Sequence, residues 1–112
     1  MNDQLVDRKC KPCEGGVPPL EAAAARQLLQ ALNSDWTISS DGKWLRRDFV
    51  FSGFNRTMGF VNAVAWIANT EGHHPDLEVH YGNCVVNYTT HAIDGLSEND
   101  FICAAKIDRL LD

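Results

Sequence analysis

The sequence lacks the features that mark a membrane, secreted or nucleic-acid-binding protein. No apolar run is long enough to cross a bilayer, and the first nine residues lack the apolar core of a signal peptide. Positive charge is in deficit, with ten Lys and Arg against fifteen Asp and Glu and a net charge of −5. This balance argues against a nucleic-acid backbone or an anionic membrane surface as the main partner. We therefore expect a cytoplasmic protein that binds neither nucleic acid nor membrane.

Cysteine is limited to four residues, Cys10, Cys13, Cys84 and Cys103. Without a secretion signal, reduced thiols are the default state. Cys10 and Cys13 have the spacing of half a zinc site or of a redox pair, but no second such pair follows at finger-like spacing. The favoured interpretation is that both are exposed thiols in a mobile arm.

Length and composition predict one domain with one modest core, because the chain has 112 residues, 45% of them hydrophobic and 22% charged. Three of the four prolines and two glycines fall within residues 1–19, which we therefore expect to form an irregular N-terminal arm. Residues 20–112 are expected to form the single folded domain.

Apolar periodicity predicts an α+β fold. Helical spacing marks residues 20–33, 54–69 and the segment that Ser97 opens. Alternating or apolar runs mark strands at residues 36–38, 44–51, 77–81 and 84–90, with Gly82-Asn83 as a two-residue hairpin turn. The order α-β-β-α-β-β-α, with hairpin-connected strand pairs, predicts a four-stranded antiparallel sheet with three helices packed on one face.

Two helices carry further expectations. The helix over residues 54–69 is apolar over a wide arc, which predicts burial on two sides, by the sheet and by another subunit. In the last helix, the expected buried stripe consists of Phe101, Ala104, Ile107 and Leu111.

Three of the four histidines form the most informative pattern. His73 and His74 precede Pro75 on the turn after the second helix, and His91 closes the strand over residues 84–90, so the hairpin should bring it near His74. Imidazole can give and take a proton near neutral pH, and no obvious nucleophile accompanies the cluster. Proton transfer is therefore favoured over acyl transfer and over an idle histidine pair at a helix C-terminus. The fourth histidine, His80, is interpreted as solvent-facing.

Acidic residues near this cluster have structural explanations. Ser97 and Asp100 have the spacing of a helix capping box, which would by itself make Asp100 structural. Glu71 and Asp76 are interpreted as exposed loop acids. A zinc site built from the three histidines is disfavoured, because no convincing fourth ligand accompanies them.

These residues resemble the pterin-4a-carbinolamine dehydratase family. The matching pattern is His-His-Pro at 73–75, five residues, Tyr81, nine residues, His91, eight residues and Asp100. The resemblance extends through residues 54–60 and 95–100 and covers about residues 20–110. One departure is Asn69, which stands four positions before His73 where the family often has an ionisable residue.

The resemblance implies the same fold and a reaction. Water would be lost from 4a-hydroxytetrahydropterin to give the quinonoid dihydropterin, with no metal or organic cofactor. The resemblance also implies roles for single residues: His73 and His91 in acid/base catalysis, His74 in binding the pterin ring and Asp100 in supporting the site.

The resemblance also implies partners and alternatives. Such an enzyme would recycle tetrahydropterin behind an aromatic amino acid hydroxylase, as a homodimer or homotetramer. Some relatives act as a dimerisation cofactor for a transcription factor, so one alternative is a non-catalytic binding module on the same fold. A further alternative is a protein of this fold without dehydratase activity that serves another pathway.

Overall fold

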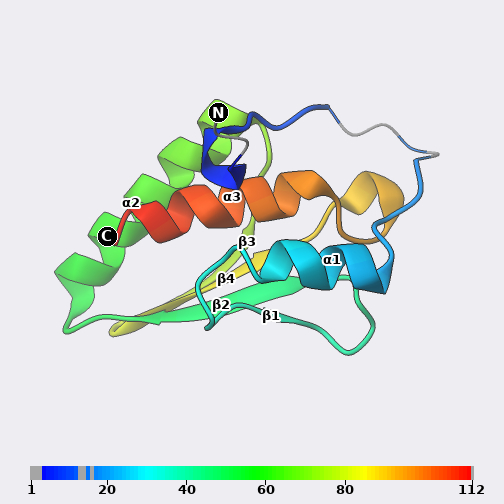
Figure 1. Cartoon of the computed structure of the whole chain (residues 1–112). Coiled ribbons are helices and arrows are strands. Elements are labelled where there is room, and N and C mark those ends of the chain that lie inside the picture. The colour runs from blue at the N-terminus through cyan, green and yellow to red at the C-terminus, as the bar shows by residue number, and fades with distance from the viewer. Residues whose placement is uncertain (1–3, 13–14, 16, 112) are drawn as a thin grey trace.

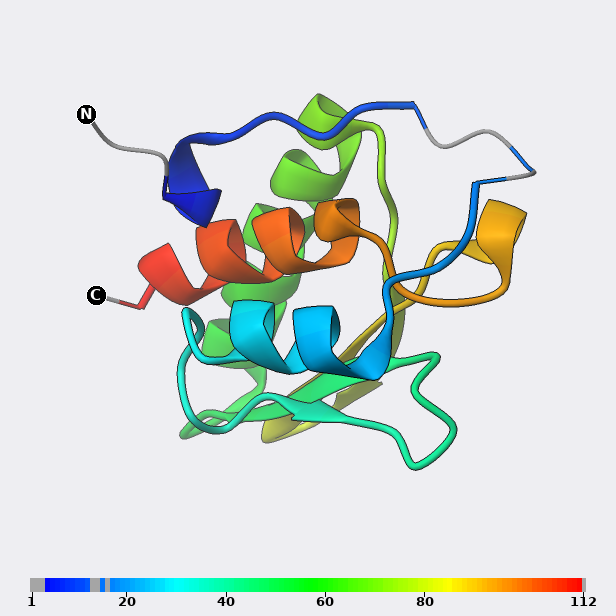
Figure 2. The same ribbon diagram turned by 45° about the vertical axis from the view of Figure 1, so that its right-hand side comes forward.

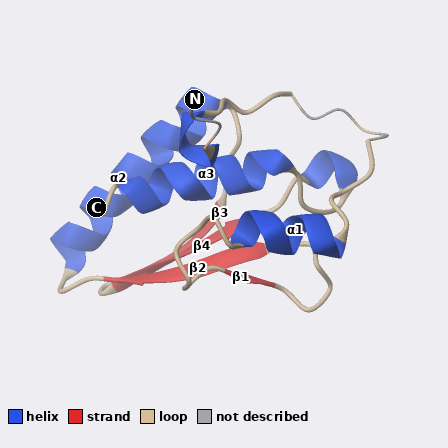
Figure 3. Ribbon diagram, in the orientation of Figure 1, coloured by secondary structure: helices blue, strands red, loops and turns tan. Residues whose placement is uncertain are grey.

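The computed structural model describes residues 4–12, 15 and 17–111. Three helices lie on one face of a four-stranded antiparallel sheet (Figures 1 and 3), which confirms the predicted α+β fold and element order. The helices are α1 (Ala22–Leu29), α2 (Phe54–Glu71) and α3 (Glu98–Arg109). The strands are β1 (Thr37–Ile38), β2 (Leu45–Val50), β3 (Asp76–His80) and β4 (Asn83–Tyr88).

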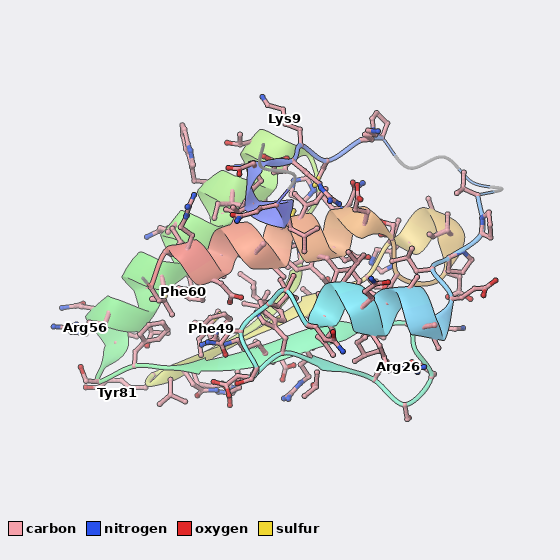
Figure 4. The ribbon with its side chains drawn as sticks, viewed as in Figure 1. Lys9, Arg26, Phe49, Arg56, Phe60 and Tyr81 are labelled. Atoms are coloured by element: carbon pink, nitrogen blue, oxygen red, sulfur yellow. The ribbon has the colours of Figure 1, made fainter. Side chains whose placement is uncertain are left out.

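The core lies between the sheet and the helices. The strand order is β1-β2-β4-β3, and every neighbouring pair is antiparallel. Buried and exposed side chains alternate along β2, and the matching face of β4 carries the buried residues Cys84, Val86 and Tyr88. Phe49 of β2 meets Phe60 of α2 with ring centroids 4.5 Å apart (Figure 4). The fully buried inner residues include Leu45, Val86 and Tyr88.

Arg47 is a charged residue on this inner face, because the alternation along β2 places it on the same side as Leu45 and Phe49. Its guanidinium donates to Asp108 of α3 over 2.7 Å, and the Trp36 indole N–H donates to the same carboxylate oxygen over 2.7 Å. The other oxygen of Asp108 accepts the backbone N–H of Asn33 at 3.0 Å. Asp108 therefore ties α3 to the sheet and to the segment after α1.

The long helix α2 begins at the predicted residue and ends two residues later than predicted. Gly72 follows it with φ of 68°, a left-handed conformation that glycine adopts without steric cost and that commonly terminates helices. The buried face carries Phe60, Val64 and Ala68. Because Gly72 ends the helix, His73 is the second residue beyond it, at the mouth of the loop into β3.

Two local predictions are wrong. The hairpin loop is Tyr81-Gly82, because His80 pairs with Asn83 across the sheet. The Gly82 carbonyl accepts the Phe51 N–H at 2.8 Å, which holds Gly82 at the end of β2 and leaves Asn83 to begin β4. Leu111, expected in the buried stripe of the last helix, lies beyond α3 and is 49% exposed.

The N-terminal arm contains structure that the sequence did not predict. A short 3-10 helix, η1 (Leu5–Asp7), lies against α3 with Leu5 buried, and the arm crosses the helix layer on the side away from the sheet (Figure 2). Arg8 forms an ion pair of 2.6 Å with Glu98 at the start of α3. Cys10 is half-buried rather than exposed, whereas Cys13 lies outside the described residues.

Across the described residues, none of the helices combines the length and apolarity that a membrane span requires.

Candidate active site

The candidate site begins at the loop between α2 and β3. His73 lies here with its side chain only 13% exposed, and its Nε2 is 2.6 Å from Oδ1 of Asp100 on α3. The ring stacks on Tyr88 of β4, with centroids 5.4 Å apart and planes 11° apart. The imidazole is therefore fixed between a strand and a helix rather than free on a loop.

Asp100 is fully buried and is bonded through both carboxylate oxygens. Oδ2 accepts the backbone N–H of Ser97 at 2.9 Å and the Thr90 hydroxyl at 2.8 Å, while Oδ1 contacts His73. The predicted capping box with Ser97 is present at the start of α3. One carboxylate thus serves as a helix cap and as the partner of an imidazole.

The Asp100 carboxylate controls the ionisation of His73. Burial disfavours the charged ring, but the hydrogen bond and the negative charge of Asp100 outweigh burial and raise the pKa of His73 above 6.5. Asp100 already accepts hydrogen bonds from Ser97 and Thr90, so we assign the proton between the pair to Nε2 of His73. Nδ1 is then the ring nitrogen left for other partners.

The three predicted histidines line one cavity of about 490 Å³, together with residues of the N-terminal arm. His73 and His74 reach it from the loop after α2, and His91 reaches it from the segment after β4. His74 and His91 are exposed, unlike His73. The expectation that the hairpin brings His91 to the same place as His74 agrees with this shared cavity.

The local structure at His91 differs from the prediction. Strand β4 ends at Tyr88, Thr90 then bridges to Gly95, and His91 opens a 3-10 turn, η2 (His91–Ile93), instead of closing the strand. The turn sets the His91 ring beside the Trp44 ring in a T-shaped arrangement, with centroids 5.9 Å apart. The sequence located the side chain but not the backbone that carries it.

Several residues around the cavity were not predicted to belong to it. Cys10, Lys11 and Pro12 of the arm form part of its wall, as does Asn99 of α3. No pattern in the arm indicates this, because its partners are distant in the sequence. Asn99 could have been suspected only from its position beside Asp100.

Two acidic residues behave differently from each other. Glu71, expected to be an exposed loop acid, ends α2 with its side chain 7% exposed and pairs with Lys106 of α3 at 3.3 Å. It also accepts the Cys10 backbone N–H at 2.9 Å. These bonds and the Lys106 charge outweigh burial and lower the pKa of Glu71 below its usual 4.5. Asp76 is exposed at the start of β3, as expected.

The remaining candidates lie away from the cavity. His80 is exposed near the end of β3, which agrees with its interpretation as a solvent-facing residue, and Asn69 is exposed on α2. In the part of the chain that the structure describes, no group of three or more His, Cys, Asp or Glu side chains is arranged to hold a metal ion. The geometry defines a buried imidazole–carboxylate pair beside two accessible imidazoles, an arrangement suited to proton transfer.

Comparisons with known proteins agree with a site for proton-transfer chemistry. A sequence profile of the family described as Pterin 4 alpha carbinolamine dehydratase matches residues 18–110. A relative from Nitrosomonas eutropha, provisionally named a pterin-4-alpha-carbinolamine dehydratase, is 58% identical over 107 residues, or 96% of this chain and 93% of its own. A relative of the same provisional name from Legionella pneumophila is 50% identical over 99% of this chain and 98% of its own. This chain belongs to the pterin-4a-carbinolamine dehydratase family.

Solved structures show the same architecture. A crystal structure from Brucella melitensis, described as a transcriptional coactivator/pterin dehydratase, has a TM-score of 0.79 and 26% identity, over 84% of this chain and 99% of that one. A pterin dehydratase-like protein described as a RuBisCO assembly factor has a TM-score of 0.59 and 21% identity, over 68% of this chain and 88% of its own. The second likeness shows the fold alone.

Proposed function

We propose that this protein dehydrates 4a-hydroxytetrahydropterin to the quinonoid dihydropterin by histidine acid/base catalysis. The observation that carries the proposal is that His73, which is bonded to the buried Asp100, lines one cavity together with His74 and His91. Membership of the dehydratase family supplies the substrate class. The proposed step is an elimination of water assisted by two proton transfers, and it calls for no metal or organic cofactor.

His73 is proposed as the acid. Its raised pKa keeps the ring protonated at a higher pH than a free imidazole, so it can give a proton to the 4a-hydroxyl as the C4a–O bond breaks. The oxygen leaves as water. Asp100 does not touch the substrate in this scheme, and its role is to hold the ring and stabilise its charge.

His91 is proposed as the base. It accepts the proton from N5 of the pterin while the electron pair of the N5–H bond forms the N5=C4a double bond. His91 is exposed in the cavity wall, so it can exchange its proton with water after each turnover. His74, also exposed there, is proposed to grip the pterin ring.

The wider role belongs to the same proposal. We infer a cytoplasmic enzyme that recycles tetrahydropterin for an aromatic amino acid hydroxylase and works as a homodimer or homotetramer. The family resemblance supports this, and α2 supports the oligomer, because Trp66 is 75% exposed and Phe54 is 51% exposed. Large exposed apolar side chains on one helix are typical of a surface that another chain covers.

The same helix favours a second candidate function. A binding module would use the Trp66 surface of α2 to dock a partner and would not need the histidines. The two candidates differ in which variants they tolerate, so a single series of proteins separates them.

The test is the dehydration of freshly generated 4a-hydroxytetrahydropterin, followed spectroscopically. Wild type should accelerate it, and His73→Ala and His91→Ala should each lose about 10²–10⁴-fold, the range attributed to one general acid or base. His80→Ala is the matched control, because it removes an exposed imidazole outside the cavity and should leave turnover unchanged. Circular dichroism should be the same for all four proteins. Well-folded wild type without activity would refute the proposal and favour the binding module.

A further inference from the structure

Two cysteines from distant parts of the chain meet between the arm and α3. The Sγ atoms of Cys10 and Cys103 are 3.5 Å apart, and both thiols are free. Cys103 is fully buried, whereas Cys10 is half-buried and so accessible from solvent. They are separated by 93 positions in the sequence, so only the fold brings them together.

The meeting of the thiols is set by backbone contacts on both sides of Cys10. Its own N–H donates to the Glu71 carboxylate at 2.9 Å. The next residue, Lys11, is bracketed by the Asn99 side chain, which accepts its N–H at 3.0 Å and donates to its carbonyl at 2.6 Å. The arm is thus held at the ends of α2 and α3 independently of the sulfur atoms.

We propose that Cys10 and Cys103 form an oxidisable dithiol, which a low-molecular-weight disulfide such as oxidised glutathione converts into an intramolecular disulfide that fastens the arm to α3. The sulfur atoms are already in contact, and a disulfide requires an S–S distance of about 2.05 Å. Rotation of the half-exposed Cys10 side chain can close the remaining gap, since Cys103 is embedded in the helix layer.

The reaction proceeds by two exchanges. The contact with Cys103 and partial burial raise the pKa of Cys10, so its thiolate is a minor form, but Cys10 is the more accessible of the two thiols. After losing its proton, Cys10 attacks one sulfur of the small disulfide and releases one thiolate, which leaves a mixed disulfide on the arm. The Cys103 thiolate then attacks the Cys10 sulfur and releases the second thiolate. The two cysteines lose two electrons, the small disulfide is reduced to two thiols, and the two cysteine protons pass to the released thiolates.

The environment of Cys103 suits the second step. In the reduced protein, the contact with the Cys10 sulfur lowers the pKa of Cys103, although burial opposes this. Once Cys10 carries the mixed disulfide it has no S–H to offer, and the nearby His73 ring continues to lower the pKa of Cys103. Cys103 stands one helical turn after Asp100 on α3, so the disulfide would lie beside the imidazole–carboxylate pair. It would also fix Lys11 and Pro12, which line the candidate site.

The experiment equilibrates the full chain with mixtures of oxidised and reduced glutathione, quenches with acid and counts alkylatable thiols by intact mass. The test protein carries Cys13→Ser and Cys84→Ala, so that Cys10 and Cys103 are its remaining thiols. It should lose two alkylatable thiols as a monomer and regain both with dithiothreitol. The matched control carries Cys10→Ser and Cys84→Ala, keeps Cys13 and Cys103, and should need at least about tenfold more oxidising glutathione.

A second readout tests whether the bond fastens the arm. The oxidised test protein should melt roughly 5 °C or more above its reduced form, because the bond closes a loop of nearly the whole chain. Equal oxidation of test and control proteins, a disulfide between two chains, a Cys10–Cys13 bond in wild type, or an unchanged melting temperature would each overturn the proposal. None of these readouts uses dehydratase activity, so failure here is distinguishable from failure of the proposed function.

Discussion

The substitution Asp100→Asn tests the centre of the candidate site with a minimal change of shape. The side chain stays planar and of similar volume but loses its charge, and one of its two acceptor oxygens becomes an amide that donates hydrogen bonds. The buried carboxylate now accepts from Ser97, Thr90 and His73. An amide has one oxygen to offer, so at least one of these donors loses its partner.

Asp100→Asn should change both the free energy of unfolding and the pKa of His73. The lost hydrogen bonds to a buried charged group should lower the free energy of unfolding by about 2 kcal/mol. The pKa of His73 should move from above 6.5 to below it, because burial disfavours the charged ring and Asp100 supplies the opposing interaction. Each unit of pKa corresponds to about 1.4 kcal/mol of differential stability.

The change in the pKa of His73 has a defined effect on how the free energy of unfolding depends on pH. In wild type, the contribution of His73 is fully present below about pH 6.5 and is lost as pH rises through its higher folded-state pKa. In Asp100→Asn, the folded pKa lies below the unfolded one, so the contribution of His73 to stability should increase with pH over the corresponding interval.

The assay combines histidine titration by NMR with urea unfolding between about pH 5 and pH 8, a range that brackets the ordinary histidine pKa. Asp76→Asn, a change at an exposed aspartate on β3, is the control and should reproduce the wild-type curves. The reasoning is refuted if the His73 titration is unmoved in Asp100→Asn, or if both proteins show the same dependence of unfolding free energy on pH.

Two further predictions concern stability. Asp108→Ala should cost about 3–5 kcal/mol in urea unfolding, because it leaves the buried Arg47 guanidinium and the Trp36 indole N–H without their shared acceptor; an unchanged midpoint would contradict the assignment. Gly72→Ala should destabilise by about 1 kcal/mol, because φ is 68° there, whereas Gly59→Ala inside α2 should stabilise by about 0.5–1 kcal/mol, because a Cβ meets nothing within 4 Å. Equal thermal shifts of the two glycine variants would argue against this reading of the backbone.

The sequence predicted the fold well where a periodic pattern coincides with burial. The long helix α2 and the alternating strand β2 follow directly from such patterns. Strand and helix ends were less predictable, because they depend on distant contacts. The hairpin loop, for example, is fixed by a bond between Gly82 and Phe51 that no local propensity encodes.

The candidate site shows the same division. Residue spacing identified the three histidines that line the cavity and the capping role of Asp100. It did not identify the arm as a wall of that cavity, because the bonds that hold Cys10 and Lys11 span 61 and 88 residues. The buried position of Glu71 depends on the same long-range contacts, since its partners come from the arm and from α3.

The double attachment of Asp100 has a consequence for comparing members of this family. A descendant that stopped using the pocket would still need a carboxylate to begin its last helix. An aspartate at this position is therefore explained by folding as well as by chemistry. His91, exposed and outside any strand or α-helix, is under no comparable constraint. Under the proposed function, drift at the position of His91 should therefore be the earlier sign that a lineage has abandoned the reaction.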